Sequence, residues 1–468
     1  MSETSAKSAQ TWALALTAAA SFMMALDAMV VTTALDTIRL DLGTSIETLE
    51  WTMNGYNLSF AVLLLTGAAL GDRFGRKRIF SAGLMLFVIA SCACALAPDA
   101  HWLIAARIVQ GVGAALVMPV GMALLSVAFP PQERAKALGQ FAGVTGLAII
   151  AGPALGGIIA QGLSWHWIFW LNVPLGLILL PLIGRHITES RGAAVPLDMT
   201  GLLLMTGASF GLVWGLIRAN DAGWSSIEVS GTLAAGAILA LAFVMWERRA
   251  AHPMVPMRLF RAHAFSGGTT AAFLYSAAMY GILFFIAQFL AVAQGHGPMS
   301  AGMHLLPWTA TLFFVAPIAG RLVNKVGERL LVVIGSTAQA IGLAWISLIV
   351  SPDTPYPALL APLILAGVGV STAMPSAQNA VIGAVAPQEI GTASGIFSTM
   401  RFLGGTFGVA IAVTAFAASG SMGSAQSFAH GFSAAIGASA VLSLLAAVAG
   451  FRIPGRRTQT TAIVPQRA

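Results

Sequence analysis

Charged side chains are scarce in this sequence. Asp, Glu, Lys and Arg make up 9% of its 468 residues and hydrophobic residues make up 57%, whereas a soluble domain carries about 25% charged residues. The mean hydropathy is +0.84. This composition excludes a soluble protein and predicts a chain that crosses a membrane many times. In such a chain the net charge of +7 is a topology signal, and it predicts no nucleic-acid partner.

Patterns typical of enzymes, metal sites and disulfides are also missing. The sequence has no GxxxxGK[ST] loop, which excludes an ATP-driven pump of the P-loop kind. Its eight histidines are scattered without metal-ligand spacing. Cys92 and Cys94 lie two residues apart on a predicted helix and point to different faces, so they predict neither a disulfide nor a metal site. We therefore expect no enzyme and no cofactor.

Long apolar runs fill most of the chain. They predict an all-α polytopic membrane protein with fourteen transmembrane helices, because about 20 apolar residues span the hydrocarbon core. Gly and Pro inside several runs are compatible with membrane helices. The expected helices cover residues 12–36, 48–70, 79–98, 102–127, 137–160, 167–184, 199–218, 229–246, 266–292, 301–323, 330–350, 358–383, 392–417 and 431–450.

The distribution of Lys and Arg supports this count. With the N-terminus inside, the inner segments hold 20 of the 24 basic residues, the outer segments hold only Arg39 and Arg218, and Arg107 and Arg401 lie within helices. If one helix were miscounted, the inner and outer segments after it would exchange sides, and the excess of Lys and Arg would lie in outer segments. We expect cytoplasmic termini, no removable signal peptide and the inner (plasma) membrane of a bacterium as the location. Contact between the basic segments and anionic lipids is a secondary possibility.

Two internal repeats divide the chain into related halves. Leu70, Asp72, Arg73 and Gly75 align with Leu322, Asn324, Lys325 and Gly327, and GVGAALVMP at 111–119 aligns with GVGVSTAMP at 367–375. Parallel halves of this kind place a substrate near the membrane midplane. The predicted parts are a cytoplasmic N-terminus (1–11), a six-helix bundle (12–185), two intervening helices (199–246), a second six-helix bundle (264–450) and a basic cytoplasmic tail (451–468).

Asp27 is an acidic residue deep within the first apolar run, Trp12 to Leu35. A charge at that depth costs at least ~2.5–3.5 kcal/mol, so the default interpretation is functional. The alternative is a carboxyl group that is simply protonated and packed. No other acidic residue is expected so deep in an apolar run.

Arg107 and Gln110 lie three residues apart on the predicted fourth helix and share a face. An Arg inside a span needs a carboxylate or a water-filled cavity. The depth of Arg107 matches that of Asp27, and the two side chains could meet directly or through water. The alternative is an Arg that extends outward to the membrane interface.

Two further motifs combine glycine with polar or kinking residues. In the loop after the second helix, Gly75 permits a tight turn, and Asp72 can bond local amides or face a neighbouring helix N-terminus. The alternative for its basic residues, Arg73, Arg76, Lys77 and Arg78, is a positive-inside anchor. In the fifth helix, Gly152, Gly156 and Gly157 form a small-residue face, and Pro153 introduces a kink. Taken alone, this face indicates close helix packing.

These motifs together resemble a known family. Residues 165–176 read WHWIFWLNVPLG. Taken alone, their aromatic residues are typical of a belt at the membrane interface. The order Trp-x-Trp-Ile-Phe-x-x-Asn-Val-Pro, however, closely resembles the fourteen-helix drug:proton antiporters, the QacA/EmrB-like branch of the major facilitator superfamily. Residues 68–78, 107–111 and 151–157 resemble its signature loop, Arg-x-x-Gln-Gly motif and Gly-Pro-x-x-Gly-Gly antiporter motif. The sequence departs from the family at Met29, Thr32, Asp36, Ala68 and Ala148.

The resemblance implies proton-coupled export of lipophilic, often cationic, compounds by alternating access. It implies that Arg107 takes part in proton transfer with Asp27 and that Asp72 belongs to an inner-side latch. Candidate substrate-cavity residues are Met24, Asp27, Gln110, Tyr275, Tyr280, Gln288, Gln378 and Asn379. Such residues are otherwise ordinary core or lipid-facing side chains. Arg401, beside several glycines, is a candidate for gating or for structure.

The predicted partners are a small-molecule substrate, the lipid bilayer and the proton as coupling ion. Whether a periplasmic adaptor joins the protein in a Gram-negative host stays open. A rival within transporters is an exporter of one endogenous metabolite or antibiotic. A rival of another class is a membrane partner or sensor that transports nothing.

Overall fold

The computed structural model describes residues 3–192, 196–386 and 389–455, which are helical with short connections. The first half contains α1 (Glu3–Asp41), α2 (Ile46–Phe74), α3 (Arg76–Ala95), α4 (Ala100–Ala128), α5 (Pro131–Gly162), α6 (His166–Trp170) and α7 (Asn172–His186). The intervening pair is α8 (Met199–Ala222) and α9 (Ile227–Glu247). The second half contains η1 (Met257–Arg261), α10 (His263–Gln288), η2 (Phe289–Ala293), α11 (Pro298–His304), α12 (Leu306–Val326), α13 (Glu328–Ile349), α14 (Tyr356–Gly383), α15 (Ile390–Ser419) and α16 (Ala425–Gly450).

Thirteen helical stretches within the described residues are long and apolar enough to cross a membrane. Each matches one of the fourteen predicted runs. The remaining run, 137–160, lies in α5, a helix of 32 residues that is not among the thirteen. The chain is therefore a multi-pass all-α membrane protein, and the count of fourteen stays a prediction.

Two predicted helices are each interrupted once. The run 167–184 breaks between α6 and α7 at Leu171, and the run 301–323 breaks between α11 and α12 at Leu305. Pro174 and Pro307 follow these breaks by two or three residues. Because proline has no N–H group, it removes one backbone hydrogen bond from the preceding turn. The first of these breaks lies directly before Asn172.

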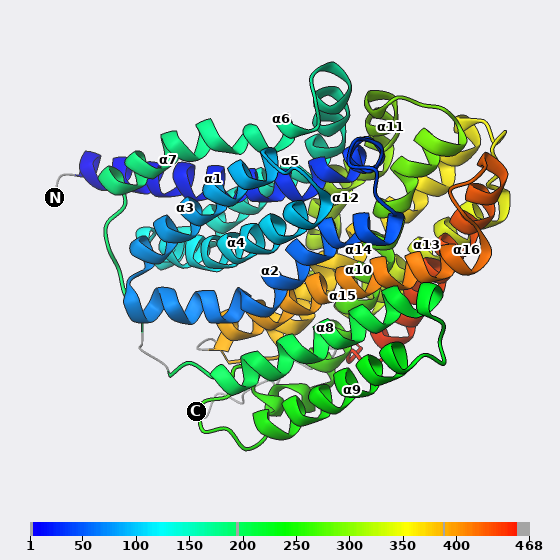
Figure 1. Cartoon of the computed structure of the whole chain (residues 1–468). Helices are drawn as coiled ribbons and strands as arrows, with labels where there is room; N and C mark the ends of the chain where they lie inside the picture. Colours follow the sequence, from blue (N-terminus) through cyan, green and yellow to red (C-terminus); the bar gives the residue numbers. More distant parts are fainter. Residues whose placement is uncertain (1–2, 193–195, 387–388, 456–468) are drawn as a thin grey trace.

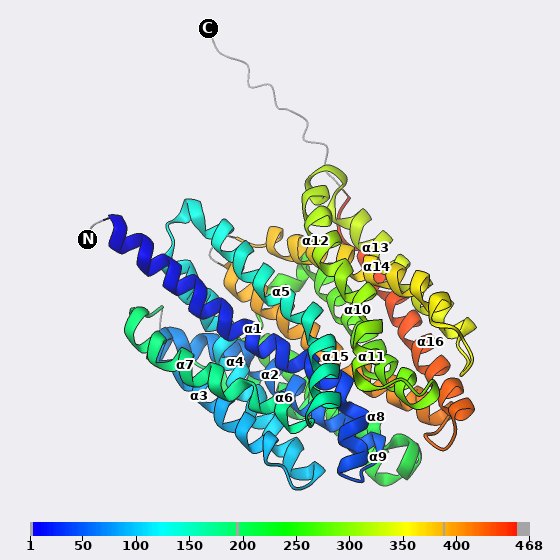
Figure 2. The ribbon, with the colours of Figure 1, turned by 90° about the horizontal axis from the view of Figure 1, so that it is seen from above.

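The packing of the first half recurs in the second. Figure 2 shows α1 to α7 on the left and α10 to α14 with α16 on the right. The contacting pairs α1–α5, α2–α4, α3–α4, α3–α7 and α1–α7 correspond to α10–α15, α12–α14, α13–α14, α13–α16 and α10–α16. The sequence repeat is thus also a repeat of helix arrangement. Between the halves, α8 contacts both α2 and α15, and α9 packs outside α8 (Figure 1).

Glycine makes the sharp turns at equivalent places in the two halves. Gly75 joins α2 to α3 with φ 113°, and Gly327 joins α12 to α13 with φ 93°. Residues that have a side chain rarely adopt such positive φ angles, so both turns require glycine. We call the side of the bundle that carries these turns the Gly75 end. Figure 1 shows it on the left, where α1 starts and α2 and α7 end.

Gly67 allows α2 and α4 to pack backbone to backbone. A Cβ atom at Gly67 would lie 2.2 Å from the carbonyl oxygen of Ala115, and a backbone atom cannot move aside as a flexible side chain can. We expect Gly67→Ala to destabilise the protein by about 1–3 kcal/mol, the usual range for overpacking. Thermal unfolding of the purified protein in detergent measures the loss.

Gly231→Ala is the matched control, because Gly231 is also helical and no atom lies within 4 Å of the added Cβ. This variant should keep the wild-type unfolding temperature or rise slightly above it. Equal behaviour of the two variants would contradict the close contact between α2 and α4.

Candidate functional site

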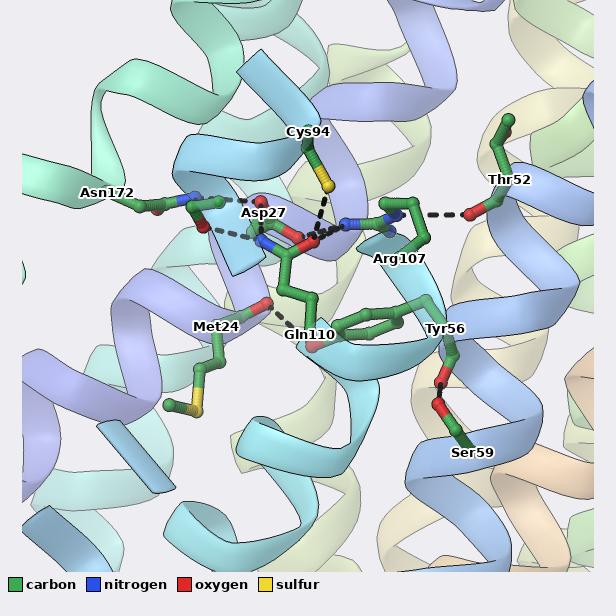
Figure 3. Close-up of polar contacts among 10 residues, drawn as sticks. Met24, Asp27, Thr52, Tyr56, Ser59, Cys94, Arg107, Gln110 and Asn172 are labelled. Carbon is green, nitrogen blue, oxygen red and sulfur yellow. Dashed lines mark hydrogen bonds and ion pairs between the residues drawn. The ribbon is translucent and has the colours of Figure 1, made fainter. Parts of the chain in front are cut away.

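Asp27 lies on α1 with only 2% of its surface exposed. Arg107 of α4, which is 1% exposed, donates a charge-assisted hydrogen bond from Nη1 to Asp27 Oδ2. Of the two arrangements that the sequence left open, the structure has the direct contact (Figure 3). Two opposite charges therefore neutralise each other inside membrane-spanning helices, where an unpaired charge is costly.

Two neutral amides complete the donor set around the Asp27 carboxyl group. Gln110 Nε2 and Asn172 Nδ2 donate to Asp27 Oδ1 over 2.9 and 2.8 Å, respectively. Both oxygens of Asp27 thus accept hydrogen bonds, and each of the three partner atoms is a donor that cannot accept a proton from Asp27. Such a set fits an ionised carboxylate, which accepts but does not donate.

Arg107 is also held by α2. Its Nε donates to the carbonyl oxygen of Thr52 over 3.1 Å, and its Nη1 donates to Gln110 Oε1 over 2.6 Å. The guanidinium carbon lies 4.3 Å from the ring centroid of Tyr56 and 5.8 Å from that of Phe169. A cation over aromatic faces is stabilised electrostatically. Arg107 therefore joins α1, α2, α4 and α6 at one point.

A second layer of polar groups orients the amides. Ser91 Oγ accepts from Gln110 Nε2 over 2.7 Å and from Asn172 Nδ2 over 3.2 Å. The Sγ atom of Cys94 lies 3.8 Å from Gln110 Oε1, with the thiol as donor. Ser91 and Cys94 are three residues apart on α3 and so share one face. These contacts fix which way each amide points.

Several residues of this network were not predicted: Thr52, Tyr56, Ser91, Cys94, Phe169 and Asn172. A polar Asn in the run 165–176 was a usable signal, because a membrane helix buries such a side chain only with a partner. Thr52 contributes its backbone carbonyl, so no sequence pattern would have revealed it. Asp27 is not the only buried acid among the described residues: Glu50, near the start of α2, is also fully buried and accepts from Asn54 Nδ2 over 2.7 Å.

The small-residue face of α5 packs against α1 beside Asp27. A Cβ atom at Gly152 would lie 2.4 Å from the Met29 Cβ, and one at Gly156 would lie 2.3 Å from the Val30 carbonyl oxygen. Gly157 is buried as well, and the side chain of Pro153 lies outside the described part. This face positions the segment of α1 that directly follows Asp27.

The loop at the Gly75 end is held by two carboxylates. Asp72 Oδ1 accepts from Arg76 Nε over 2.8 Å, while Arg73 stacks on the adjacent Phe74 ring with 5.4 Å to its centroid. Glu189 accepts from the backbone N–H groups of Lys77 and Arg78, the first residues of α3, over 2.9 and 3.3 Å. The acid at a helix N-terminus is therefore Glu189, and Asp72 has a local arginine partner instead.

The candidate cavity residues separate into two groups. Met24, Tyr275, Tyr280 and Gln288 are buried; the carbonyl of Met24 accepts from the Tyr56 hydroxyl over 3.5 Å, and Gln288 Nε2 donates to the Phe284 carbonyl over 2.7 Å. Gln378 and Asn379, in contrast, are exposed near the Gly75 end of α14.

Asn379 Nδ2 donates to Glu328 Oε1 over 2.8 Å, beside a cavity of about 350 Å³ that Val323 and Ile453 also line. The structure therefore does not bring Gln378 or Asn379 to Asp27. Arg401 is partly exposed on α15, and its Nε has no hydrogen-bond partner in the described residues.

Comparisons with known proteins define the class. The sequence matches the Major Facilitator Superfamily over residues 17–409 and 268–468. The cephamycin export protein CmcT of Amycolatopsis lactamdurans is 34% identical over 454 residues, covering 95% of this chain and 93% of the relative. The tetracenomycin C resistance and export protein of Streptomyces glaucescens is 33% identical over 403 residues, covering 86% and 75%. The multidrug resistance protein Stp of Mycobacterium tuberculosis is 34% identical over 392 residues, covering 83% and 73%.

Solved structures agree on the fold. A POT family transporter in complex with 5-aminolevulinic acid has a TM-score of 0.69 at 14% identity, covering 94% of each chain. A bacterial homologue of the human lysosomal transporter Spinster, in an inward-facing and unoccupied conformation, has a TM-score of 0.67 at 17% identity, covering 95% of this chain and 98% of the homologue. The chain belongs to the Major Facilitator Superfamily. It is a transporter and not an enzyme, and the resemblance to the drug antiporter branch is confirmed.

Removing one partner of the buried ion pair should destabilise the folded protein. Arg107→Met leaves Asp27 as an uncompensated buried charge, and such a change costs about 3–5 kcal/mol. We expect the double variant Asp27→Asn, Arg107→Met to recover much of this loss, because no charge then remains unpaired. Unfolding of the single and double variants in detergent gives the coupling between the two sites.

Arg39→Met supplies the control. Arg39 pairs with Asp36 at 2.9 Å where both side chains are about one-fifth exposed (20% and 21%), and a pair of this kind contributes at most about 1 kcal/mol. A double variant no more stable than Arg107→Met alone would argue against a direct pair.

Proposed function

We propose that this transporter exports lipophilic, often cationic, drugs or toxic compounds in exchange for protons. The observation that carries the proposal is the buried pair of Asp27 and Arg107 within membrane-spanning helices. A titratable group at such depth is costly and by default indicates a function. The names of the relatives, which are drug or antibiotic export and resistance proteins, support drugs as the substrate class.

Proton exchange at Asp27 supplies the driving step. A proton from outside neutralises Asp27, and Arg107, Gln110 and Asn172 then lose the charge that holds them together. Deprotonation toward the inside restores the network. Substrate is released on the outside while Asp27 is protonated, and new substrate binds while it is ionised. This order makes each proton that enters drive one export step.

A route from Asp27 to the second half runs through α2. Arg107 holds α2 at Thr52 and Tyr56, and one turn further along α2 the Phe60 ring lies 4.3 Å from the Phe402 ring of α15. A change in Arg107 therefore acts on the helix that packs against the other half. This route couples protonation to the relative movement of the halves, as alternating access requires.

The sequence also supports a proposal for how the helices are oriented in the membrane. Fourteen spans, with α5 as the fifth, place both ends of the chain in the cytoplasm and the Gly75 end on the inner side of a bacterial inner membrane. The supporting observation is the excess of Lys and Arg in the segments of that side.

A narrower function is the second candidate. CmcT is named as an exporter of cephamycin, and the tetracenomycin C protein is likewise named for one compound. An exporter of one metabolite or antibiotic uses the same proton site but responds to a single substrate class. In proteoliposomes with an internal pH dye, proton movement triggered by several unrelated drugs favours the broad exporter.

Asp27→Asn tests the proton step. The amide has the size of the carboxyl group but cannot exchange a proton near neutral pH, so we expect export driven by a pH gradient to fall to the level of empty vesicles. The elution profile of the purified protein should persist, which shows that the variant is folded. Uptake of a fluorescent lipophilic cation into inverted vesicles, with and without a pH gradient, measures the effect.

Asp36→Asn is the control on the same helix, because Asp36 lies at the far end of α1 and bonds only Arg39 among the described residues. This variant should retain export. Undiminished gradient-driven export by the Asp27 variant would remove Asp27 from the proton step, whatever the substrate.

A further inference from the structure

Two carboxyl groups meet where the intervening helices reach the Gly75 end. Asp198 directly precedes α8, and Glu247 is the last residue of α9. A Cβ atom at Gly201 would lie 2.6 Å from Asp198 Oδ2 and 2.7 Å from Glu247 Oε1, so these two oxygens face the same small space.

Each carboxyl group has one satisfied oxygen and one unsatisfied oxygen. Asp198 Oδ1 accepts from the backbone N–H of Gly201 and from the indole N–H of Trp246, both over 2.8 Å. Glu247 Oε2 accepts from the backbone N–H of Val255 over 3.0 Å. The remaining pair, Asp198 Oδ2 and Glu247 Oε1, is buried and has no hydrogen-bond donor among the described residues.

Among the described residues, no cation compensates this pair. Glu247 is 2% exposed, and neither acid forms an ion pair with Lys, Arg or His in the part of the chain that the structure describes. Other titratable groups nearby in the sequence face solvent: Arg248, Arg249, His252, Arg258, Arg261 and His263. Two adjacent carboxylates whose facing oxygens are buried and unsatisfied would repel each other strongly.

We propose that Asp198 and Glu247 form a second proton-binding site, in which one proton is shared between Asp198 Oδ2 and Glu247 Oε1. One proton removes the repulsion and satisfies both oxygens at once, through a charge-assisted O–H···O hydrogen bond. The resulting group carries a single negative charge, which the Trp246, Gly201 and Val255 donors stabilise. This site is separate from Asp27 and does not depend on drug export.

The site controls a segment that joins the two halves. We call residues 248–262, between α9 and α10, the strap. Val255 of the strap is bonded to Glu247, Met254 Sδ accepts from Thr66 of α2 over 3.9 Å, and Arg258 forms an ion pair with Glu389 at the start of α15. Loss of the shared proton forces Asp198 and Glu247 apart and loosens the strap from α9. Proton occupancy there thus regulates how firmly the strap ties α2 to α15.

Infrared difference spectroscopy of the purified full-length protein tests the proposal directly. The experiment uses a background with Asp27→Asn and Glu50→Gln, which removes the other two buried carboxyl groups from the spectrum, and a titration from pH 5 to pH 9. We expect one protonated-carboxyl band that persists well above the pH at which free carboxyl groups ionise (about 4). Adding Glu247→Gln or Asp198→Asn should abolish this band or move its titration to lower pH.

Glu228→Gln is the matched control, because Glu228 lies at the opposite end of α9 and pairs with Arg218; the band should be unchanged. A band absent from the parent protein, or identical in all variants, overturns the proposal. So does a band that Na⁺ or Ca²⁺ removes while raising the unfolding temperature, because the site would then hold a metal cation. None of these measurements involves transport, so their failure is distinct from failure of the proposed export function.

Stability as a function of pH provides the second measurement. The folded state keeps a proton that the unfolded chain releases above about pH 4.5, so this contribution to stability is lost as pH rises toward the value at which the folded pair deprotonates. We expect the unfolding temperature of the parent protein to fall as pH rises, and that of the Glu247→Gln variant to change less. Parallel pH profiles would contradict the shared proton.

Discussion

The buried pair of Asp27 and Arg107 is the constraint on which the first half depends. In a region that excludes water, separating these charges leaves each one without a partner, and the cost exceeds that of most packing defects. The structure therefore surrounds them with hydrogen-bonding groups from α2, α4 and α7. The glycines of α5 serve the same end, because they bring that helix against the segment of α1 next to Asp27. A change in the charge of one side chain is thus felt by five helices.

The second half has the same helix arrangement as the first but does not repeat the pair of Asp27 and Arg107. Gly111 of α4 matches Gly367 of α14, and both allow a close approach to a neighbouring helix. At the position that matches Arg107, however, α14 has Leu363, and residues 275–281 of α10, which match the surroundings of Asp27, carry no charged side chain. The repeat therefore conserves packing, while the titratable pair is confined to one half. Such an asymmetry lets one half change its charge state while the other provides a constant surface.

Features governed by local composition could be predicted from the sequence. Apolar runs located the spans, the energetic cost of a buried charge singled out Asp27 and Arg107, and helical spacing put Gln110 on the face of Arg107. The partners contributed by other helices could not be predicted. Thr52 acts through a backbone carbonyl, and Glu189 reaches α3 from a loop more than a hundred residues later. Asn379 has a polar side chain in an apolar run, but depth along α14, and not residue type, determines that it lies near Glu328.

The intervening helices show how a membrane protein can add parts without disturbing its transport core. α9 exposes most of its surface and, among the described helices, packs mainly on α8, so lipid can surround it at little cost. At one end Glu228 of α9 pairs with Arg218 of α8, and at the other end Glu247 lies beside Asp198 and accepts from Val255 of the strap. Because the strap from that end reaches both α2 and α15, the intervening helices α8 and α9 act on the two helices that connect the halves. Asp27 and the Asp198–Glu247 pair therefore both act on the contact between α2 and α15. Asp27 acts near the middle of this contact, and the Asp198–Glu247 pair acts at its Gly75 end.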